Sequence, residues 1–116
     1  MDVRKLFKSF GYALYGIFSA MKEQNMRIHI LSAFIVVAAG LVTGLSYLEW
    51  LVLIIIIVLV IGAEMMNTAI ESIVDLASPE IHPLAKQAKD IAAGAVLVFA
   101  LASVIIGLLI FLPKWF

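Results

Sequence analysis

The sequence predicts an all-α integral membrane protein that forms a single domain over residues 1–116. Its composition is the first reason. Hydrophobic residues make up 65% and charged residues 14% of the chain, whereas soluble domains contain roughly 45–50% and about 25%. The second reason is that three apolar segments are each long enough to cross a bilayer. The third is that nearly all lysines and arginines fall on one side of those segments.

The composition also excludes several kinds of chemistry. The chain has no cysteine, which removes disulfides, thiolate nucleophiles and cysteine-based zinc sites. Its formal net charge is zero, so the overall charge indicates neither a nucleic acid nor an acidic partner. The N-terminus lacks a compact apolar core followed by a small-residue cleavage site, and we expect it to be retained.

Residues 3–25 are expected to form a basic amphipathic helix on the membrane surface. Apolar side chains recur there at spacings of three and four, and Arg4, Lys5, Lys8 and Lys22 take the other side. A face rich in lysine and arginine favours the interface with anionic headgroups. The alternative is a peripheral helix packed on a soluble core, which the apolar segments that follow argue against.

The first transmembrane helix is predicted at about residues 28–45, after a polar hinge over residues 23–29. Gly40 and Gly44 form a small-xxx-small pair, a weak indication of close helix packing. Residues 46–50 are predicted to be a short turn, so that the next helix returns antiparallel.

The second span is predicted at about residues 50–70, within a helix that continues to about Leu76. Two Xaa-Pro pairs within residues 77–83 predict a turn. The third helix is expected to start at Leu84 with polar residues and to span the membrane over about residues 91–112. Seven of the eight lysines and arginines then lie on the side of the N-terminus, which is predicted to be cytoplasmic.

Four polar residues of the second helix share one face. Glu64, Asn67, Glu71 and Asp75 fall within about 80° of one another at roughly 100° per residue. A carboxylate within a span costs roughly 2.5–3.5 kcal/mol on insertion scales, so such residues are normally paired, protonated or part of a polar site. Glu64, the deepest, suits a general base at the boundary of lipid and water. The alternative is a neutral glutamate hydrogen-bonded to a neighbouring helix.

Further polar residues on the predicted cytoplasmic side are candidates for binding a metal and a polyphosphate. Glu71 and Glu23 could offer carboxylates to Mg²⁺, which typically takes one or two of them together with substrate phosphates. Asn67 lies between the base and the metal position. Lys89 and Asp90 could balance a polyphosphate, or simply form a solvated helix start. The chain contains no P-loop motif, so any nucleotide must be held by scattered side chains.

Two segments resemble the prokaryotic diacylglycerol kinase family. They are Glu64-Met-Met-Asn67-Thr-Ala-Ile-Glu71-Ser-Ile-Val-Asp75 and the run from His82-Pro-Leu-Ala to Lys89-Asp90. The resemblance implies a small trimeric membrane kinase with a surface helix and three spans, which uses Mg²⁺ and ATP to phosphorylate a lipid hydroxyl. The active sites would be shared between the chains of the homotrimer.

The resemblance also implies roles for individual residues. Glu64 would be the catalytic base that contacts the lipid substrate. Glu23 and Glu71 would bind Mg²⁺, and Asn67 would be a supporting polar group. The implied ATP-binding residues are Arg4, Lys5, Tyr12, Glu23, Glu71, Asp75, Glu80, His82, Lys89 and Asp90.

Residues 23–29, Glu-x-Asn-x-Arg-Ile-His, and the turn Asp75-Leu-Ala-Ser resemble the Gram-positive branch of the family, whose members are similar to undecaprenol kinases. This implies a bacterial cytoplasmic membrane protein that converts undecaprenol to undecaprenyl phosphate. The alternative substrate is diacylglycerol, which would give phosphatidic acid. A membrane assembly factor or a small proton-coupled transporter are alternatives of other classes, and neither explains the whole set of polar residues.

Overall fold

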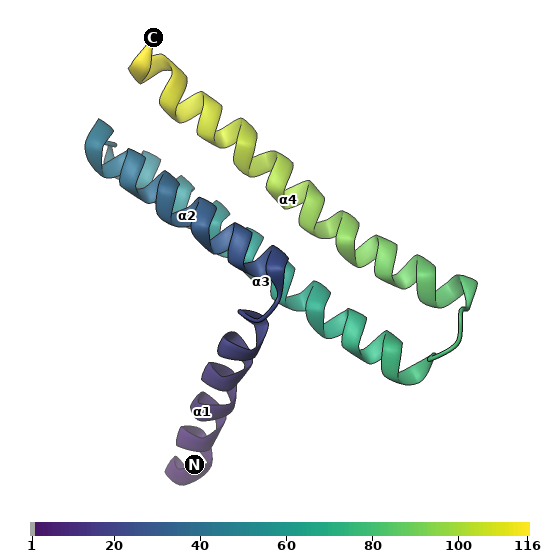
Figure 1. Cartoon of the computed structure of the whole chain (residues 1–116). Coiled ribbons are helices and arrows are strands. Elements are labelled where there is room, and N and C mark those ends of the chain that lie inside the picture. The colour runs from purple at the N-terminus through teal and green to yellow at the C-terminus, as the bar shows by residue number, and fades with distance from the viewer. Residues whose placement is uncertain (1) are drawn as a thin grey trace.

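The computed structural model describes residues 2–116 and contains four helices within them: α1 (Val3–Ala20), α2 (Gln24–Thr43), α3 (Tyr47–Ala77) and α4 (Pro83–Trp115) (Figure 1). No strand occurs among these residues. Helices α2, α3 and α4 are each long and apolar enough to cross a membrane. The all-helical fold with three such helices is therefore confirmed.

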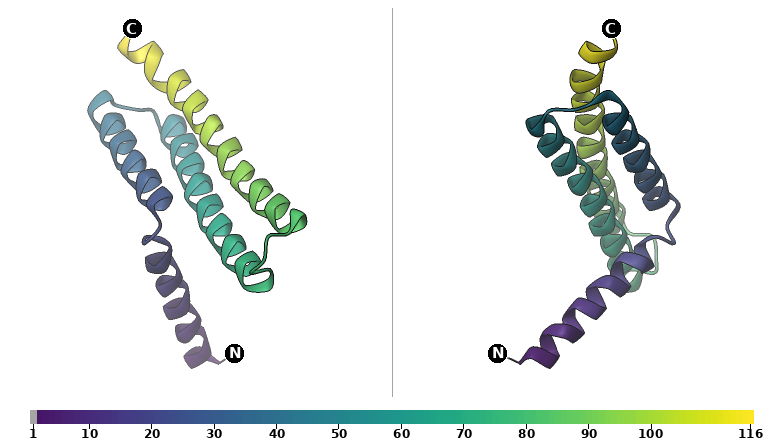
Figure 2. Two further views of the ribbon diagram at one scale, coloured as in Figure 1. Left: turned by 45° about the vertical axis from the view of Figure 1, so that its right-hand side comes forward. Right: turned by 90° about the vertical axis from the view of Figure 1, so that its left-hand side faces the viewer.

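The three long helices run side by side, and α3 lies between α2 and α4 (Figure 2). Consecutive helices are antiparallel. Helix α1 leaves the bundle at the start of α2, and its N-terminus points away from the other helices. Most large apolar side chains of the long helices are exposed, as expected of surfaces that face lipid tails or other chains.

Local signals in the sequence explain where the helices begin and end. Ser46 and Glu49 form a capping box at the start of α3, in which each side chain accepts from the other residue's backbone N–H. His82 caps α4, its Nδ1 accepting from the N–H of Leu84, and Pro83 occupies the first turn. Gly44, with φ of 79°, ends α2 in a conformation that favours glycine.

The structure corrects the expected element boundaries. The surface helix was expected to reach residue 25, but α1 ends at Ala20 and only residues 21–23 separate it from α2. Residues 24–29 of the predicted hinge are helical, with Glu23 as N-cap. Because the capping box fixes Ser46 as the N-cap of α3, Tyr47 to Trp50 form its first turn rather than a loop. That α1 lies on a membrane surface stays a prediction.

The glycines expected to bring helices together have two different roles. A Cβ added at Gly40 would lie 2.8 Å from the ring of Trp50, so this glycine allows α2 to approach α3 closely. A Cβ at Gly44 would meet nothing within 4 Å, and this residue serves the end of the helix. Of the two glycines in the small-xxx-small pattern, only Gly40 therefore contributes to helix packing.

Four polar and aromatic residues tie the three long helices together at the end of the bundle farthest from the α3–α4 loop. We call Thr43, Glu49, Lys114 and Trp115 the end cluster. Trp115 Nε1 donates to Thr43 Oγ1 over 2.9 Å, and Lys114 Nζ lies 3.0 Å from Glu49 Oε1. The apolar core beneath it includes Leu53, Ile56, Val60, Ile110 and Phe111. The end cluster fixes the C-terminus of α4 against both other spans.

Replacing Trp115 by phenylalanine should lower the stability of the folded protein by about 1 kcal/mol, because the hydrogen bond between α4 and α2 is lost while an aromatic ring is kept at this position. Unfolding in detergent micelles, followed by circular dichroism, measures this. The control is Tyr47→Phe, which removes a polar group from a side chain that is 81% exposed at the same end. Equal stability of the two variants would contradict the prediction.

Candidate active site

The predicted polar face of α3 passes from the buried interior to the exposed end of the helix. Glu64 and Asn67 are 3% and 5% exposed, the only buried polar or charged residues among those described. Glu71, one turn after Asn67, is half-buried, and Asp75 is exposed. The Glu64 side chain is therefore shielded from water, whereas the Asp75 side chain is exposed to it.

Glu64 contacts His29 of α2. The two side chains are 5% and 20% exposed, and His29 Nε2 lies 3.6 Å from Glu64 Oε2. The distance exceeds that of a hydrogen bond but is within the range of an ion pair. From the sequence, His29 was assigned to a hinge and had no predicted role. The only available signal was a titratable residue at the start of an apolar span.

The carboxylates predicted to act together lie near one another. Asn67 Nδ2 donates to Glu71 Oε1 over 2.8 Å, and the charges of Glu71 and Glu23 both act on Glu64. Asn67 Oδ1 is buried and has no hydrogen-bond partner among the described residues. A buried amide oxygen normally accepts a hydrogen bond, so this atom is suited to accept one from a bound ligand.

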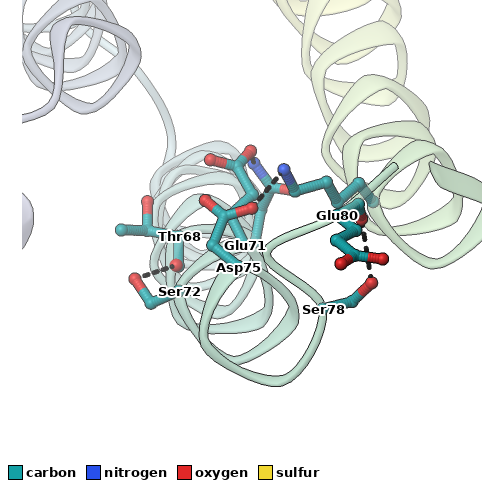
Figure 3. A network of polar contacts seen from close by, with 8 residues as sticks. Thr68, Glu71, Ser72, Asp75, Ser78 and Glu80 are labelled. Atoms are coloured by element: carbon teal, nitrogen blue, oxygen red, sulfur yellow. Dashed lines mark hydrogen bonds and ion pairs between the residues drawn. The ribbon is translucent and has the colours of Figure 1, made fainter. Parts of the chain in front are cut away.

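Beyond Glu71, an ion pair joins α3 to α4. Lys89 Nζ lies 2.5 Å from Asp75 Oδ1. Figure 3 shows Asp75, with a dashed contact to a nitrogen atom, beside Glu71. Lys89 belongs to the polar first turns of α4, ahead of its apolar part. The hydrogen bond that Lys89 donates to Asp75 raises the pKa of the Lys89 ammonium above its usual value, and the charge of Glu71 adds to this. Lys89 therefore remains a cation beside the carboxylate face.

The α3–α4 loop and the start of α4 hold three more of the predicted residues. Glu80 is exposed, and its backbone oxygen accepts from Ser78 Oγ over 3.0 Å. His82 caps α4, and Asp90 pairs with Lys86 over 2.6 Å. Glu80, His82 and Asp90 are thus solvent-accessible at the same end of the bundle as Asp75, but no contact links them to Glu64.

The predicted site residues of α1 do not lie close to the carboxylates of α3. Arg4 and Lys5 lie in its first turn, at the end that points away from the bundle, and their backbone N–H groups donate to Asp2 (Figure 2). Tyr12, halfway along α1, is 74% exposed. In a single chain these three side chains stand apart from the carboxylate face.

An apolar groove leads away from the buried end of the polar face. Its volume is about 520 Å³, and it lies between α2 and α4 with α3 as its floor. His29, which contacts Glu64, lines one end, and Trp115 of the end cluster lines the other. The residues between them are mainly aliphatic, such as Val36, Val60 and Leu108. The groove has the length and polarity for a hydrocarbon chain.

The donors on this face suit a hard cation. Among the described residues, no three His, Asp or Glu side chains form a ready metal cluster. Magnesium, however, binds oxygen ligands and usually takes only one or two carboxylates, with water and phosphate oxygens completing its shell. Glu23 and Glu71 supply carboxylates of this kind near Glu64. The residues present therefore fit a magnesium ion that is bound together with a phosphate ligand.

The fold and this site define a small helical membrane protein with a carboxylate-rich site at one end of an apolar groove. Residues 11–111 match the family model "Prokaryotic diacylglycerol kinase", and the chain belongs to that family.

Known relatives agree with this assignment. The chain is 48% identical to an undecaprenol kinase of Bacillus subtilis (strain 168) over 114 residues, which cover 97% of this chain and 93% of the relative. It is 44% identical to a diacylglycerol kinase of Synechocystis over 93% of this chain and 63% of the relative. A diacylglycerol kinase of Helicobacter pylori (strain J99) is 39% identical over 82% of this chain and 75% of the relative.

These relatives make the chain a lipid kinase, an enzyme that transfers a phosphoryl group from ATP to a membrane lipid. The prediction of a lipid kinase is thereby confirmed. The assembly factor and the transporter, which the sequence analysis left open, receive no support from the relatives.

Proposed function

We propose that the protein is a magnesium-dependent undecaprenol kinase that converts undecaprenol to undecaprenyl phosphate. The observation that carries this proposal is its 48% identity to an undecaprenol kinase over 97% of the chain, above the identity to the diacylglycerol kinases compared. The apolar groove supports it, because a long polyprenyl chain can lie between α2 and α4 with its hydroxyl at the Glu64 end. Diacylglycerol is the second candidate, favoured by the names of the other relatives.

Glu64 is the general base in this proposal. Its carboxylate takes the proton of the lipid hydroxyl as the hydroxyl oxygen attacks the γ-phosphorus of ATP. The buried position of Glu64 next to the groove supports this role, since the acceptor arrives from the lipid side. Asn67 holds Glu71 by its hydrogen bond, and its free amide oxygen is available to accept a hydrogen bond from a bound water.

Glu23 and Glu71 would hold Mg²⁺, and Lys89, freed from Asp75 or shared with it, would contact the phosphates. Bound Mg²⁺ would neutralise charge on the phosphate oxygens of ATP. The remaining proposed nucleotide contacts lie at the open end of the site or on α1; they are Asp75, Glu80, His82, Asp90, Tyr12, Arg4 and Lys5.

We further propose that the enzyme is a homotrimer with shared active sites and that the N-terminus and the site face the cytoplasm. The first turn of α1 points away from its own chain's site, so Arg4 and Lys5 could reach ATP only in another chain. The exposed apolar surfaces of α2, α3 and α4 offer area for such assembly. Seven of eight lysines and arginines lie at the end of the bundle that holds the site, which supports the orientation.

Undecaprenol should be phosphorylated with a kcat/KM at least about tenfold higher than that for diacylglycerol when both are presented in the same detergent with the same Mg²⁺ and ATP. The physical reason is that each isoprenyl unit placed in the groove adds apolar contact. Transfer of labelled phosphate from ATP to each lipid measures the two rates. A preference for diacylglycerol would overturn the proposed substrate, and phosphorylation of neither lipid would overturn the activity.

A further inference from the structure

The proposed role of Glu64 as a general base requires that its carboxylate be ionised. A general base must be ionised before it can accept a proton, yet Glu64 is only 3% exposed to water. Removing a carboxylate from water without a counter-charge is strongly unfavourable, and such a group takes up a proton instead. A cation in contact with Glu64 is therefore needed for the proposed chemistry.

Most of the charged neighbours have the wrong sign. Glu71, two turns further along the same helix, and Glu23, the N-cap of α2, are both acidic, and neighbouring negative charges cannot act as counter-ions for a carboxylate. From α4, the ammonium of Lys89 pairs with Asp75 rather than with Glu64. Within residues 2–116, the ion-pair partner that the structure gives Glu64 is His29.

We propose that His29 is a positioning residue that, as an imidazolium, keeps Glu64 ionised and directs its carboxylate toward the groove. Three observations place it there. Its Nε2 lies 3.6 Å from Glu64 Oε2, both side chains are largely buried, and His29 also lines the groove that would hold the lipid. An imidazolium in contact with a carboxylate favours the ionised form of that carboxylate.

This inference rests on the proposed role of Glu64 as the base, and it changes no bond in the reaction. The lipid oxygen forms a bond to the γ-phosphorus while the bond from that phosphorus to the oxygen bridging it to the β-phosphate breaks, and ADP leaves. The hydroxyl proton passes to Glu64. His29 keeps its own proton throughout and acts only through the carboxylate of Glu64.

Two substitutions at His29 separate charge from shape. His29→Gln keeps a polar side chain of similar length without a charge, and His29→Lys supplies a permanent positive charge. With undecaprenol and Mg-ATP at pH 7, we expect kcat to fall at least tenfold in His29→Gln and less than threefold in His29→Lys, with little change in the KM for ATP. In His29→Gln the acid limb of the pH–rate profile should also move to higher pH by about one unit, so that activity recovers as the pH rises.

A purely structural role of His29 would produce a different result. It would lower the activity of both variants equally and leave the shape of the pH profile unchanged, and either finding would overturn the proposal. Circular dichroism in detergent and retained binding of Mg-ATP establish that each variant is folded.

Glu64→Gln is measured in the same assay, so that the proposed role of Glu64 and the proposed role of His29 are tested separately. An inactive Glu64→Gln together with a His29→Gln of normal rate and profile would reject the role of His29 alone. An active Glu64→Gln would reject Glu64 as the base, and with it the inference about His29.

Discussion

Replacing Glu64 by glutamine should lower lipid phosphorylation by about 10²–10⁴-fold, the usual contribution of a general base. The amide has almost the same size and keeps polar atoms next to His29, but it cannot take the proton of the lipid hydroxyl. The loss should appear in kcat, while binding of Mg-ATP stays near that of the unchanged protein, because the proposed phosphate contacts lie further along α3 and on α4. Steady-state phosphate transfer and Mg-ATP binding by calorimetry measure the two quantities.

The matched control for this variant is Glu49→Gln, at the opposite end of the same helix. Glutamine can still form the capping box with Ser46, so that α3 starts as before and activity should be retained. If Glu64→Gln is folded, binds Mg-ATP and turns over within about threefold of the unchanged protein, Glu64 is not the base.

Replacing Glu71 by glutamine should give the second large effect, an increase of about tenfold or more in the Mg²⁺ concentration needed for half-maximal rate. The substitution exchanges a charged oxygen ligand for a neutral amide, and hard cations bind carboxylates more strongly. The glutamine amide oxygen can still accept the hydrogen bond from Asn67, so the variant removes the charge and keeps this contact. Phosphate transfer measured over a series of Mg²⁺ concentrations at fixed ATP reports this requirement.

Two further measurements make the magnesium prediction specific. Glu49→Gln should keep the Mg²⁺ dependence of the unchanged protein, because Glu49 lies in the end cluster, at the opposite end of α3 from Glu71. In Glu71→Gln, raising Mg²⁺ should recover part of the rate, which no concentration should do for Glu64→Gln. Magnesium dependence identical in Glu71→Gln and the unchanged protein would remove Glu71 from the metal site.

The sequence was sufficient for the parts of the fold that depend on one segment at a time. Unbroken apolar runs predicted three long helices, and the spacing of Glu64, Asn67 and Glu71 placed them on one face; in the structure Asn67 and Glu71 are hydrogen-bonded. The helix ends were less accurate. Polarity marked residues 24–29 as a hinge, although polar side chains in the first turns of a helix are compatible with helical backbone.

The parts that depend on contacts between helices were not predictable in the same way. His29 and Glu64 are 35 residues apart in the numbering, and no periodicity within either segment relates them. Lys89 was expected to balance a polyphosphate or to belong to a solvated helix start, and its pairing with Asp75 of α3 was not foreseen; a phosphate contact of Lys89 stays a prediction. Such pairs are set by how α2 and α4 pack on α3, which a pattern along one helix does not contain.

The unequal lengths of the helices have a consequence for how the enzyme handles two substrates of opposite solubility. Helix α2, with 20 residues, is about 30 Å long and matches the hydrocarbon thickness, whereas α3, with 31 residues, exceeds it by about 16 Å. Glu64 contacts His29 in the second turn of α2, and Asp75 lies about 16 Å further along α3. The polar face of α3 therefore extends over two depths. A lipid can keep its chain in the hydrocarbon region with only its terminal hydroxyl at the level of Glu64, while a triphosphate can stay in water near Asp75.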